Sequence, residues 1–284
     1  MKMKILRSCS AFLFAALLLG AMTGCGKKAP IDKERVAVDE SRGIHFSEDK
    51  RQLEAFNPKL EIKEYAAPTG ITAVGGRAFE KCSNLTNVTL PDGVTAIGER
   101  AFLECTRLAT IALPASVETI GDYAFENCRT LSIAAVPAGM TAIGKGVFKD
   151  CKKLTGITIP AGVRTIGYQA FYNCESLTGV TLPAELKIIE DSAFEECENL
   201  TAVTIPEKTT KIGADAFKKC RRLTSVNFPA TLTSIGPGAF EGCRNLARVR
   251  IPKSVKSIGA GAFKGCPCEK QVKSDYKELY NYED

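Results

Sequence analysis

The sequence of 284 residues contains no tryptophan and only one histidine, His45. Histidine is the side chain that most often carries out general acid–base catalysis, and no Ser or Asp constellation recurs around His45. The sequence also contains no glycine-rich phosphate loop and no nucleotide-binding motif. Its glycines recur instead at fixed positions of a repeat. These absences predict a protein that is not an enzyme and that uses no cofactor.

The chain also lacks a long apolar run. The run Ala11–Met22 follows the basic segment Met1–Arg7, and it spans only about a dozen residues, whereas a membrane-spanning helix needs ~20. This arrangement is typical of a secretory signal. The residues Met22-Thr-Gly-Cys25 resemble the lipobox of bacterial lipoproteins, which implies cleavage after residue 24 and lipidation of Cys25. An ordinary signal peptide with a chance cysteine is the alternative.

Charge of one sign is scarce. The formal net charge of +6 includes Lys2, Lys4 and Arg7 of the expected signal, and without them 35 basic residues face 32 acidic ones. Nucleic-acid-binding proteins concentrate much stronger basic charge. We therefore expect no nucleic-acid partner.

The sequence instead repeats the same residue types with a period of 23 residues. A phenylalanine column runs from Phe79 to Phe263 and a proline column from Pro68 to Pro252. Three columns in register over eight successive intervals indicate a stack of repeated units. The third column consists of Cys82, Cys105, Cys128, Cys151, Cys174, Cys197, Cys220, Cys243 and Cys266.

One unit, Leu85–Arg107, contains three apolar segments. The first alternates like a strand and ends at a proline, which cannot donate to a sheet. The second is a short apolar pair closed by a glycine, and the third has the spacing of one or two helical turns. A unit this small cannot bury its apolar stripe alone, so stacked units share one core. The segments contain Val88 and Leu90, then Val94 and Ile97, then Ala101, Phe102 and Cys105.

The pattern L-x-x-V-x-L-P-x-x-V-x-x-I-G-x-x-A-F-x-x-C resembles the BspA-like leucine-rich repeat of the Treponema pallidum type, from about Ala55 to Cys268. The resemblance implies an α/β repeat fold: a right-handed leucine-rich-repeat solenoid of 23-residue units with a parallel concave sheet and short helical turns. It also implies a surface protein, because several members of this family are adhesins. It leaves the ligand open, because the shared residues are core residues.

Departures from the pattern divide the chain. We expect a signal peptide at 1–24, a lipid-anchored tether at 25–45, an N-terminal cap at 46–61, the solenoid at 62–268 and a C-terminal cap at 269–284. Ser47 is a candidate N-cap of a helix over Ser47–Phe56. A second helix over Asp275–Tyr282 is expected to close the other end. Inside the array, Glu190 replaces the glycine of the Gly98 column, where we expect glycine to allow close approach between coils.

The cysteine column is interpreted as a buried, reduced structural ladder. Stacked coils keep neighbouring Cβ atoms parallel and farther apart than the ~3.8 Å mean of disulfides, and a line of thiols does not surround a metal ion tetrahedrally. We therefore expect no metal site. Cys268 lies off the column, and a bridge between Cys268 and Cys266 is left open.

The solvent side of the strands is the candidate binding surface, because repeat proteins commonly bind there. Small neutral residues dominate it until charge appears in the last coil, so a protein surface or extended chain could approach closely. The alternatives are that small residues only tolerate curvature and that the basic end is an ordinary solvated rim. The candidate partner-binding residues are Thr158, Thr181, Thr204, Asn227, Arg244, Arg248 and Arg250.

These observations favour a membrane-anchored surface binding or adhesion protein. Its expected partner is an extracellular or envelope protein, with anionic or glycosylated partners included, and its expected place is the outer membrane or cell surface. A periplasmic or envelope scaffold is the alternative.

Overall fold

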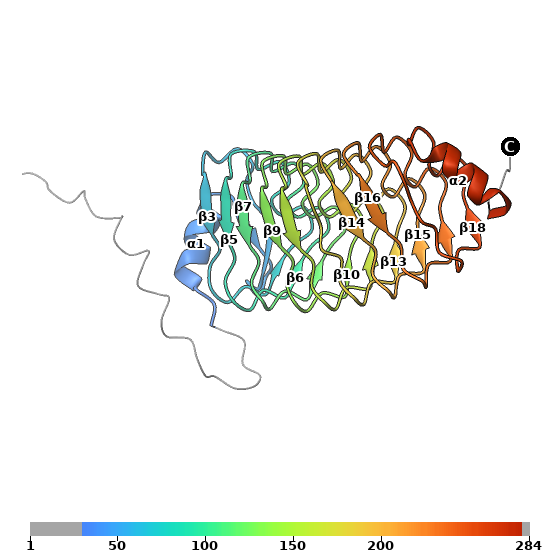
Figure 1. Cartoon of the computed structure of the whole chain (residues 1–284). Helices are drawn as coiled ribbons and strands as arrows, with labels where there is room; N and C mark the ends of the chain where they lie inside the picture. Colours follow the sequence, from blue (N-terminus) through green and yellow to red (C-terminus); the bar gives the residue numbers. More distant parts are fainter. Residues whose placement is uncertain (1–29, 280–284) are drawn as a thin grey trace, which may run out of the picture.

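The computed structural model describes residues 30–279, which stack as successive coils into one rod (Figure 1). The predicted signal peptide and Cys25 lie outside the described residues. No helix within residues 30–279 has the length and apolar character needed to cross a membrane. The fold prediction is confirmed: the chain forms a parallel-stranded leucine-rich-repeat solenoid with a repeat of 23 residues.

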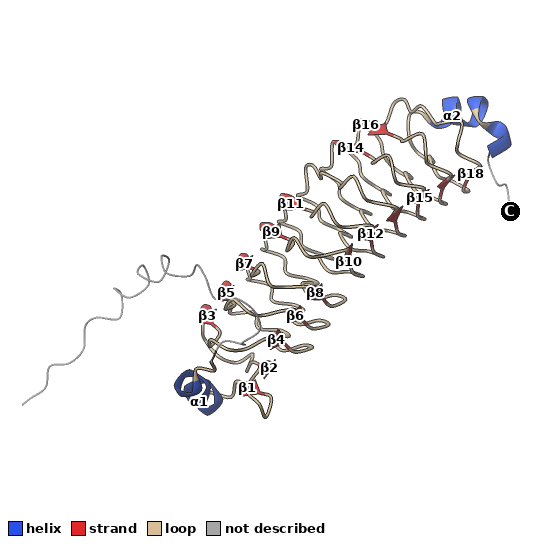
Figure 2. Cartoon of the chain, turned by 90° about the horizontal axis from the view of Figure 1, so that it is seen from below, coloured by secondary structure: helices blue, strands red, loops and turns tan. Residues whose placement is uncertain are grey.

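One side of the rod, called here the strand face, carries three-residue parallel strands in strict 23-residue register; for example, Val88 pairs with Ile111. Figures 1 and 2 show these strands along one flank. Five of them form one sheet and two form another. The strands are β3 (Glu64–Ala66), β5 (Asn87–Thr89), β7 (Thr110–Ala112), β9 (Ile133–Ala135) and β11 (Gly156–Thr158), then β14 (Ala202–Thr204) and β16 (Ser225–Asn227).

A second flank carries shorter parallel strands, each two residues long from Ala73–Val74 onward, in the same register. They form one sheet near the N-terminus and a six-stranded sheet that continues to the last coil. The strands are β4 (Ala73–Val74), β6 (Ala96–Ile97), β8 (Thr119–Ile120), β10 (Ala142–Ile143), β12 (Thr165–Ile166), β13 (Ile188–Ile189), β15 (Lys211–Ile212), β17 (Ser234–Ile235) and β18 (Ser257–Ile258).

The third flank was expected to contain helical turns, and this expectation is wrong in detail. No helix is assigned between residues 62 and 268. The backbone instead makes successive turns closed by bonds of the i→i+3 type, such as Cys105 N–H to the Phe102 carbonyl at 3.1 Å. Residues in the left-handed region, such as Arg100 at φ 55° and Glu104 at φ 60°, interrupt any longer helix.

The phenylalanine column forms the centre of the core. Successive rings from Phe79 to Phe263 stack with centroids 4.8 to 5.6 Å apart and planes within 11° of parallel. All nine rings are buried. Because each ring inside the column touches the rings of the coils before and after it, these coils depend on their neighbours for burial.

The cysteine column lies buried beside the phenylalanine column. Each thiol donates a hydrogen bond to the phenylalanine carbonyl one coil back, as Cys105 does to Phe79 at 3.0 Å and Cys174 to Phe148 at 3.2 Å. That carbonyl already accepts the N–H of its own coil's cysteine, as with Phe79 and Cys82. The thiol therefore fills a second acceptor position inside an apolar core.

The N-terminal end differs from the expectation. The helix α1 (Lys33–Ser41) lies inside the predicted tether, and β1 (His45–Phe46) pairs antiparallel with β2 (Gln52–Ala55) where a helix was predicted. The helix prediction over Ser47–Phe56 is wrong because β2 continues the second flank through parallel pairing with β4. The Ser47 hydroxyl stabilises a turn by accepting the Gln52 N–H at 2.9 Å.

Helix α1 closes the first coil through a buried polar contact. The fully buried carboxylate of Asp39 accepts the Tyr65 hydroxyl at 2.8 Å, and Arg35 lies 3.3 Å from the same oxygen. Burial, followed by the Asp39 contacts, raises the pKa of Tyr65 far above its ordinary value. The cap is therefore held by a specific hydrogen bond as well as by apolar packing.

The helix of the C-terminal cap begins earlier than the predicted helix over Asp275–Tyr282. Helix α2 (Glu269–Asp275) ends where the predicted helix was to begin, and the 3₁₀ helix η1 (Lys277–Leu279) follows. Val272 is fully buried, and the Tyr276 hydroxyl accepts the N–H of Ile251 at 3.3 Å. Residues 280–284, the rest of the predicted helix, lie outside the described part of the chain.

The glycine column supports the expectation of close approach. A Cβ atom on Gly98 would lie 2.4 Å from the backbone nitrogen of Gly76, and Gly98 has no positive φ. Glu190 occupies this column without a positive φ, and its carboxylate accepts the Tyr168 N–H at 2.8 Å. Glycine is therefore favoured here for the space between coils and not for backbone conformation.

Candidate functional site

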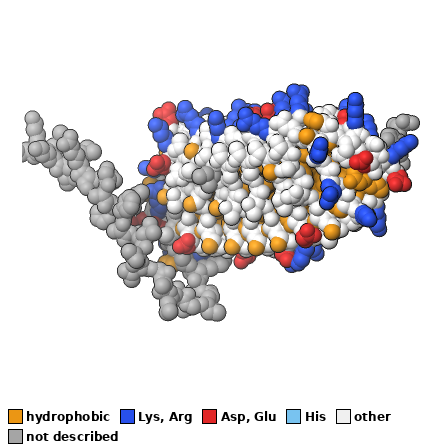
Figure 3. All heavy atoms as spheres, in the orientation of Figure 1, with side chains coloured by type: hydrophobic (Ala, Val, Ile, Leu, Met, Phe, Trp, Pro, Cys, Tyr) orange, Lys and Arg blue, Asp and Glu red, His pale blue; other side chains and the backbone are white. Residues whose placement is uncertain are grey.

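The strand face is the broad surface that the repeat leaves available. Inward residues such as Val88 and Val203 are buried, and the residues on either side of them project outward. Figure 3 shows this face as mostly neutral, with Lys and Arg side chains along one long edge and at the C-terminal end. The predicted binding residues Thr158, Thr181, Thr204, Asn227, Arg244, Arg248 and Arg250 are all exposed.

The strand face is not one continuous sheet. Thr181 pairs with Thr158 only through an isolated bridge, and no strand is assigned to residues 179–181 or 248–250. The second flank stays paired through the same coils, from β12 through β13 to β15. The solenoid therefore loosens on the strand face alone, after Thr181 and again after Asn227.

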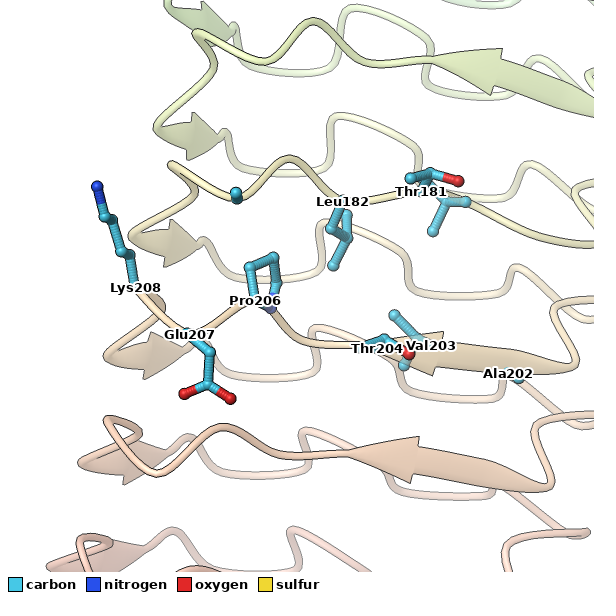
Figure 4. A pocket seen from close by; sticks show the side chains of 10 residues that line it. Thr181, Leu182, Ala202, Val203, Thr204, Pro206, Glu207 and Lys208 are labelled. Carbon is cyan, nitrogen blue, oxygen red and sulfur yellow. The ribbon is translucent and has the colours of Figure 1, made fainter.

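An apolar groove lies at the first interruption. Its volume is about 580 Å³, and it runs between the coil of Thr181 and the coil of Thr204. Figure 4 shows Leu182 and Pro206 extending into the space between these coils, with Glu207 and Lys208 at one end. The groove, which we call the coil groove, is lined by Val180, Thr181, Leu182, Ala184, Ala202, Val203, Thr204, Pro206, Glu207 and Lys208.

Several basic residues in the middle of the rod are paired across coils. The ammonium group of Lys152 lies 2.6 Å from Glu175, and Lys219 lies 2.6 Å from Glu196 one coil back. The hydrogen bond that Lys219 donates to Glu196 is the main reason that the pKa of Lys219 is raised. A repeat of 23 residues brings such partners side by side, so these charges neutralise one another.

The last coils are different. Residues 221–274 contain ten Lys and Arg against two Asp and Glu, whereas residues 30–220 contain 22 against 26. Arg244, Arg248 and Arg250 are exposed, and none of them makes an ion pair within the described structure. Val249 between two of them is buried, so the predicted alternation holds although no strand forms there. We call Arg248 and Arg250 the arginine pair.

The buried thiols are poor nucleophiles. Burial raises the pKa of Cys82 and of Cys197 to about 12, and the thiolate is the reactive form. A hydrogen bond to Cys266, followed by burial, raises the pKa of Cys268 well above its usual value. All ten cysteines from Cys82 to Cys268 are unpaired in the described structure. The solution redox state of the ladder stays a prediction.

Two other candidate sites receive no support from the geometry. His45 is exposed on β1 at the N-terminal end. Among residues 30–279, no group of three or more His, Cys, Asp or Glu side chains is placed to hold a metal ion.

Sequence reasoning found the strand face and the arginine pair but missed the coil groove. The segment Gly179-Val-Thr181 has the same pattern as Gly156-Ile-Thr158, which does form a strand. No local signal distinguishes the two segments, because the difference lies in how adjacent coils approach one another.

Comparison with known proteins agrees with this architecture. The BspA-type leucine-rich repeat region matches in six copies, over residues 51–178 and 141–270. The chain belongs to the BspA-type leucine-rich repeat family. No curated protein matches it.

Similar solved structures are bacterial leucine-rich repeat proteins. The leucine-rich repeat protein of T. pallidum is 26% identical, with 84% of this chain and 94% of that chain covered and a TM-score of 0.46. A leucine-rich repeat protein from Eubacterium ventriosum ATCC 27560 is 25% identical, with coverages of 79% and 48% and a TM-score of 0.39. One from Bacteroides ovatus ATCC 8483 is 21% identical, with coverages of 84% and 96% and a TM-score of 0.45.

Proposed function

We propose that this protein is a lipid-anchored surface protein of a bacterium that binds another macromolecule and does not catalyse a reaction. The observation that carries the proposal is the strand face, an exposed surface of small side chains that ends in unpaired arginines. Most shared repeat residues are committed to the core, so outward residues are free to vary with the ligand. Membership of a bacterial repeat family is consistent with this role.

The proposed anchor is Cys25, held by acyl chains in the outer membrane or another surface membrane. Two or more acyl chains hold a protein on a bilayer where one is marginal. Replacing Cys25 with Ser is expected to stop incorporation of labelled fatty acid and to release the protein from the membrane fraction. Continued labelling of the C25S variant would show that the anchor is assigned wrongly.

Protease treatment of intact cells tests the location. A surface-binding protein is expected to be digested from outside, followed by recovery of a partner in a pull-down with the full chain. Protection in intact cells together with digestion in permeabilised cells would contradict surface exposure and favour the periplasmic or envelope scaffold.

A further inference from the structure

The coil groove and the arginine pair lie on the same side of the rod, two coils apart. Thr204, Asn227 and Arg250 occupy one outward row at successive 23-residue steps, and Ala202, Ser225 and Arg248 occupy the other. Parallel coils are separated by about 4.8 Å, so the groove and the arginines are roughly 10 Å apart. The row between them, Ser225 and Asn227, carries only small, uncharged and exposed side chains.

The two features differ in the chemistry that they accept. Leu182, Val203 and Pro206 give the coil groove apolar walls, which suit an aliphatic or aromatic side chain. The arginine pair offers guanidinium donors with no acidic partner, which suit a carboxylate. A ligand that contacts both features must therefore carry an apolar group and a negative charge at a fixed separation.

We propose that the strand face binds an extended acidic segment of a protein partner that runs along the rod axis. One apolar side chain of that segment enters the coil groove and a Glu or Asp carboxylate contacts Arg248 and Arg250. In the extended polyproline II conformation a chain rises about 3.1 Å per residue and has three residues per turn, so an apolar and an acidic residue three positions apart project to the same side, roughly 9 Å from each other. This inference rests on the proposed function, because it takes the strand face as the binding face.

A protein segment fits better than a glycan or a lipid surface. Sugars are commonly held by aromatic faces, and the outward rows between Asn87 and Arg250 contain no aromatic residue. A membrane headgroup layer offers charge to the arginine pair but no single apolar side chain for a groove two coils away.

The experiment uses the full chain, purified in detergent, and fluorescein-labelled peptides with a Gly-Ser background. Each peptide carries one Phe and one Glu separated by one to six positions. Fluorescence anisotropy is expected to show the tightest binding at a separation near three, and weaker binding as salt rises. Affinity that does not vary with the separation would overturn the proposal.

Two variants with matched controls assign the contacts. A202F fills the coil groove from an exposed position, and T110F places the same ring in the same row on the intact sheet at β7. R248E/R250E reverses the arginine pair, and R107E/K153E makes the same charge change at exposed positions that lie outside the outward rows. We expect both test variants to weaken binding of the best peptide at least tenfold and both controls to leave it within twofold.

The outcomes separate this inference from the proposed function. Test variants that melt like the parent chain and bind the peptide unchanged would overturn the inference. Tight binding of a sulfated oligosaccharide that R248E/R250E abolishes and A202F leaves intact would also overturn it, because the basic end would then be a glycan site. A surface partner that is recovered equally well by both test variants would overturn the inference while leaving the proposed function in place.

Discussion

Particular charged residues of the middle coils and of the last coils of this solenoid differ in whether they find a partner. In the middle, Lys152 and Lys219 pair with acids of adjacent coils, whereas Arg248 and Arg250 have no acidic partner. The backbone period is the same in both regions, so the fold does not dictate the difference. A basic residue on this scaffold is available to a ligand only where the neighbouring coil supplies no acid at the matching position.

The largest expected contrast between the two regions lies in the core. Phe171 stacks on Phe148 and Phe194, whereas Phe263 stacks on Phe240 alone. F171A is expected to lower the free energy of unfolding by about 4 kcal/mol. F263A, at an end that can fray locally, is expected to cost roughly half as much. Urea denaturation followed by circular dichroism measures both variants, and equal losses would contradict a stack that depends on two-sided contact.

The thiol column predicts a loss of stability at alkaline pH. The folded pKa values of Cys82 and Cys197 are raised to about 12, above the ~8.5 of an unfolded thiol. The stability that these thiols provide is complete below pH ~8.5 and is lost progressively as pH rises toward 12. The urea midpoint is therefore expected to fall steadily above pH 9.

The control for this pH dependence is C197A, which is expected to weaken the alkaline decline because one titrating thiol is gone. A parent chain whose urea midpoint stays flat from pH 8 to pH 10.5 would argue against reduced, buried thiols.

Titration of the denatured, unreduced full chain for free thiols is expected to find nearly all of the ten cysteines from Cys82 to Cys268, or eight if Cys266 and Cys268 are bridged. Four or fewer would contradict the ladder interpretation.

Cross-coil ion pairs give the smallest expected effect on stability. The side chain of Lys219 is 43% exposed and that of Glu196 is 23% exposed, and exposed pairs of this kind contribute about 0.5 kcal/mol. K219M is expected to lower stability by that amount in low salt and by less in high salt. R248M is expected to change stability hardly at all, because it breaks no ion pair. A larger loss for R248M than for K219M would reverse the comparison.

The sequence predicted the parts of the fold that depend on periodic core positions. Phe, Cys and Pro columns define which residues are buried and which coils are neighbours, so the register and the exposure of Arg248 could be predicted. The turns on the third flank were missed. Arg100 and Glu104 are left-handed residues in columns that also hold Gly146 and Gly242, both with positive φ. Most members of these columns are not glycine, so the preference is visible only when the coils are aligned.

The two ends were the hardest part to predict. Ser47 followed by Glu48 and Asp49 has the pattern of a helix start, but pairing of β2 with β4 overrides that local preference. Helix α1 has no continuous apolar stripe, and Val36 and Asp39 are the two residues that it buries against the first coil. Tertiary contact of this kind leaves little trace in a single sequence.

The constant 23-residue register also makes the rod extensible by simple genetic change. Duplication or deletion of one complete unit within the array leaves every column of the core in line, since each coil contacts only its two neighbours. Each added unit moves the basic end about 4.8 Å farther from the N-terminal cap. The length of the rod can therefore change without altering the residues that contact a ligand. Natural selection can act on these two properties separately.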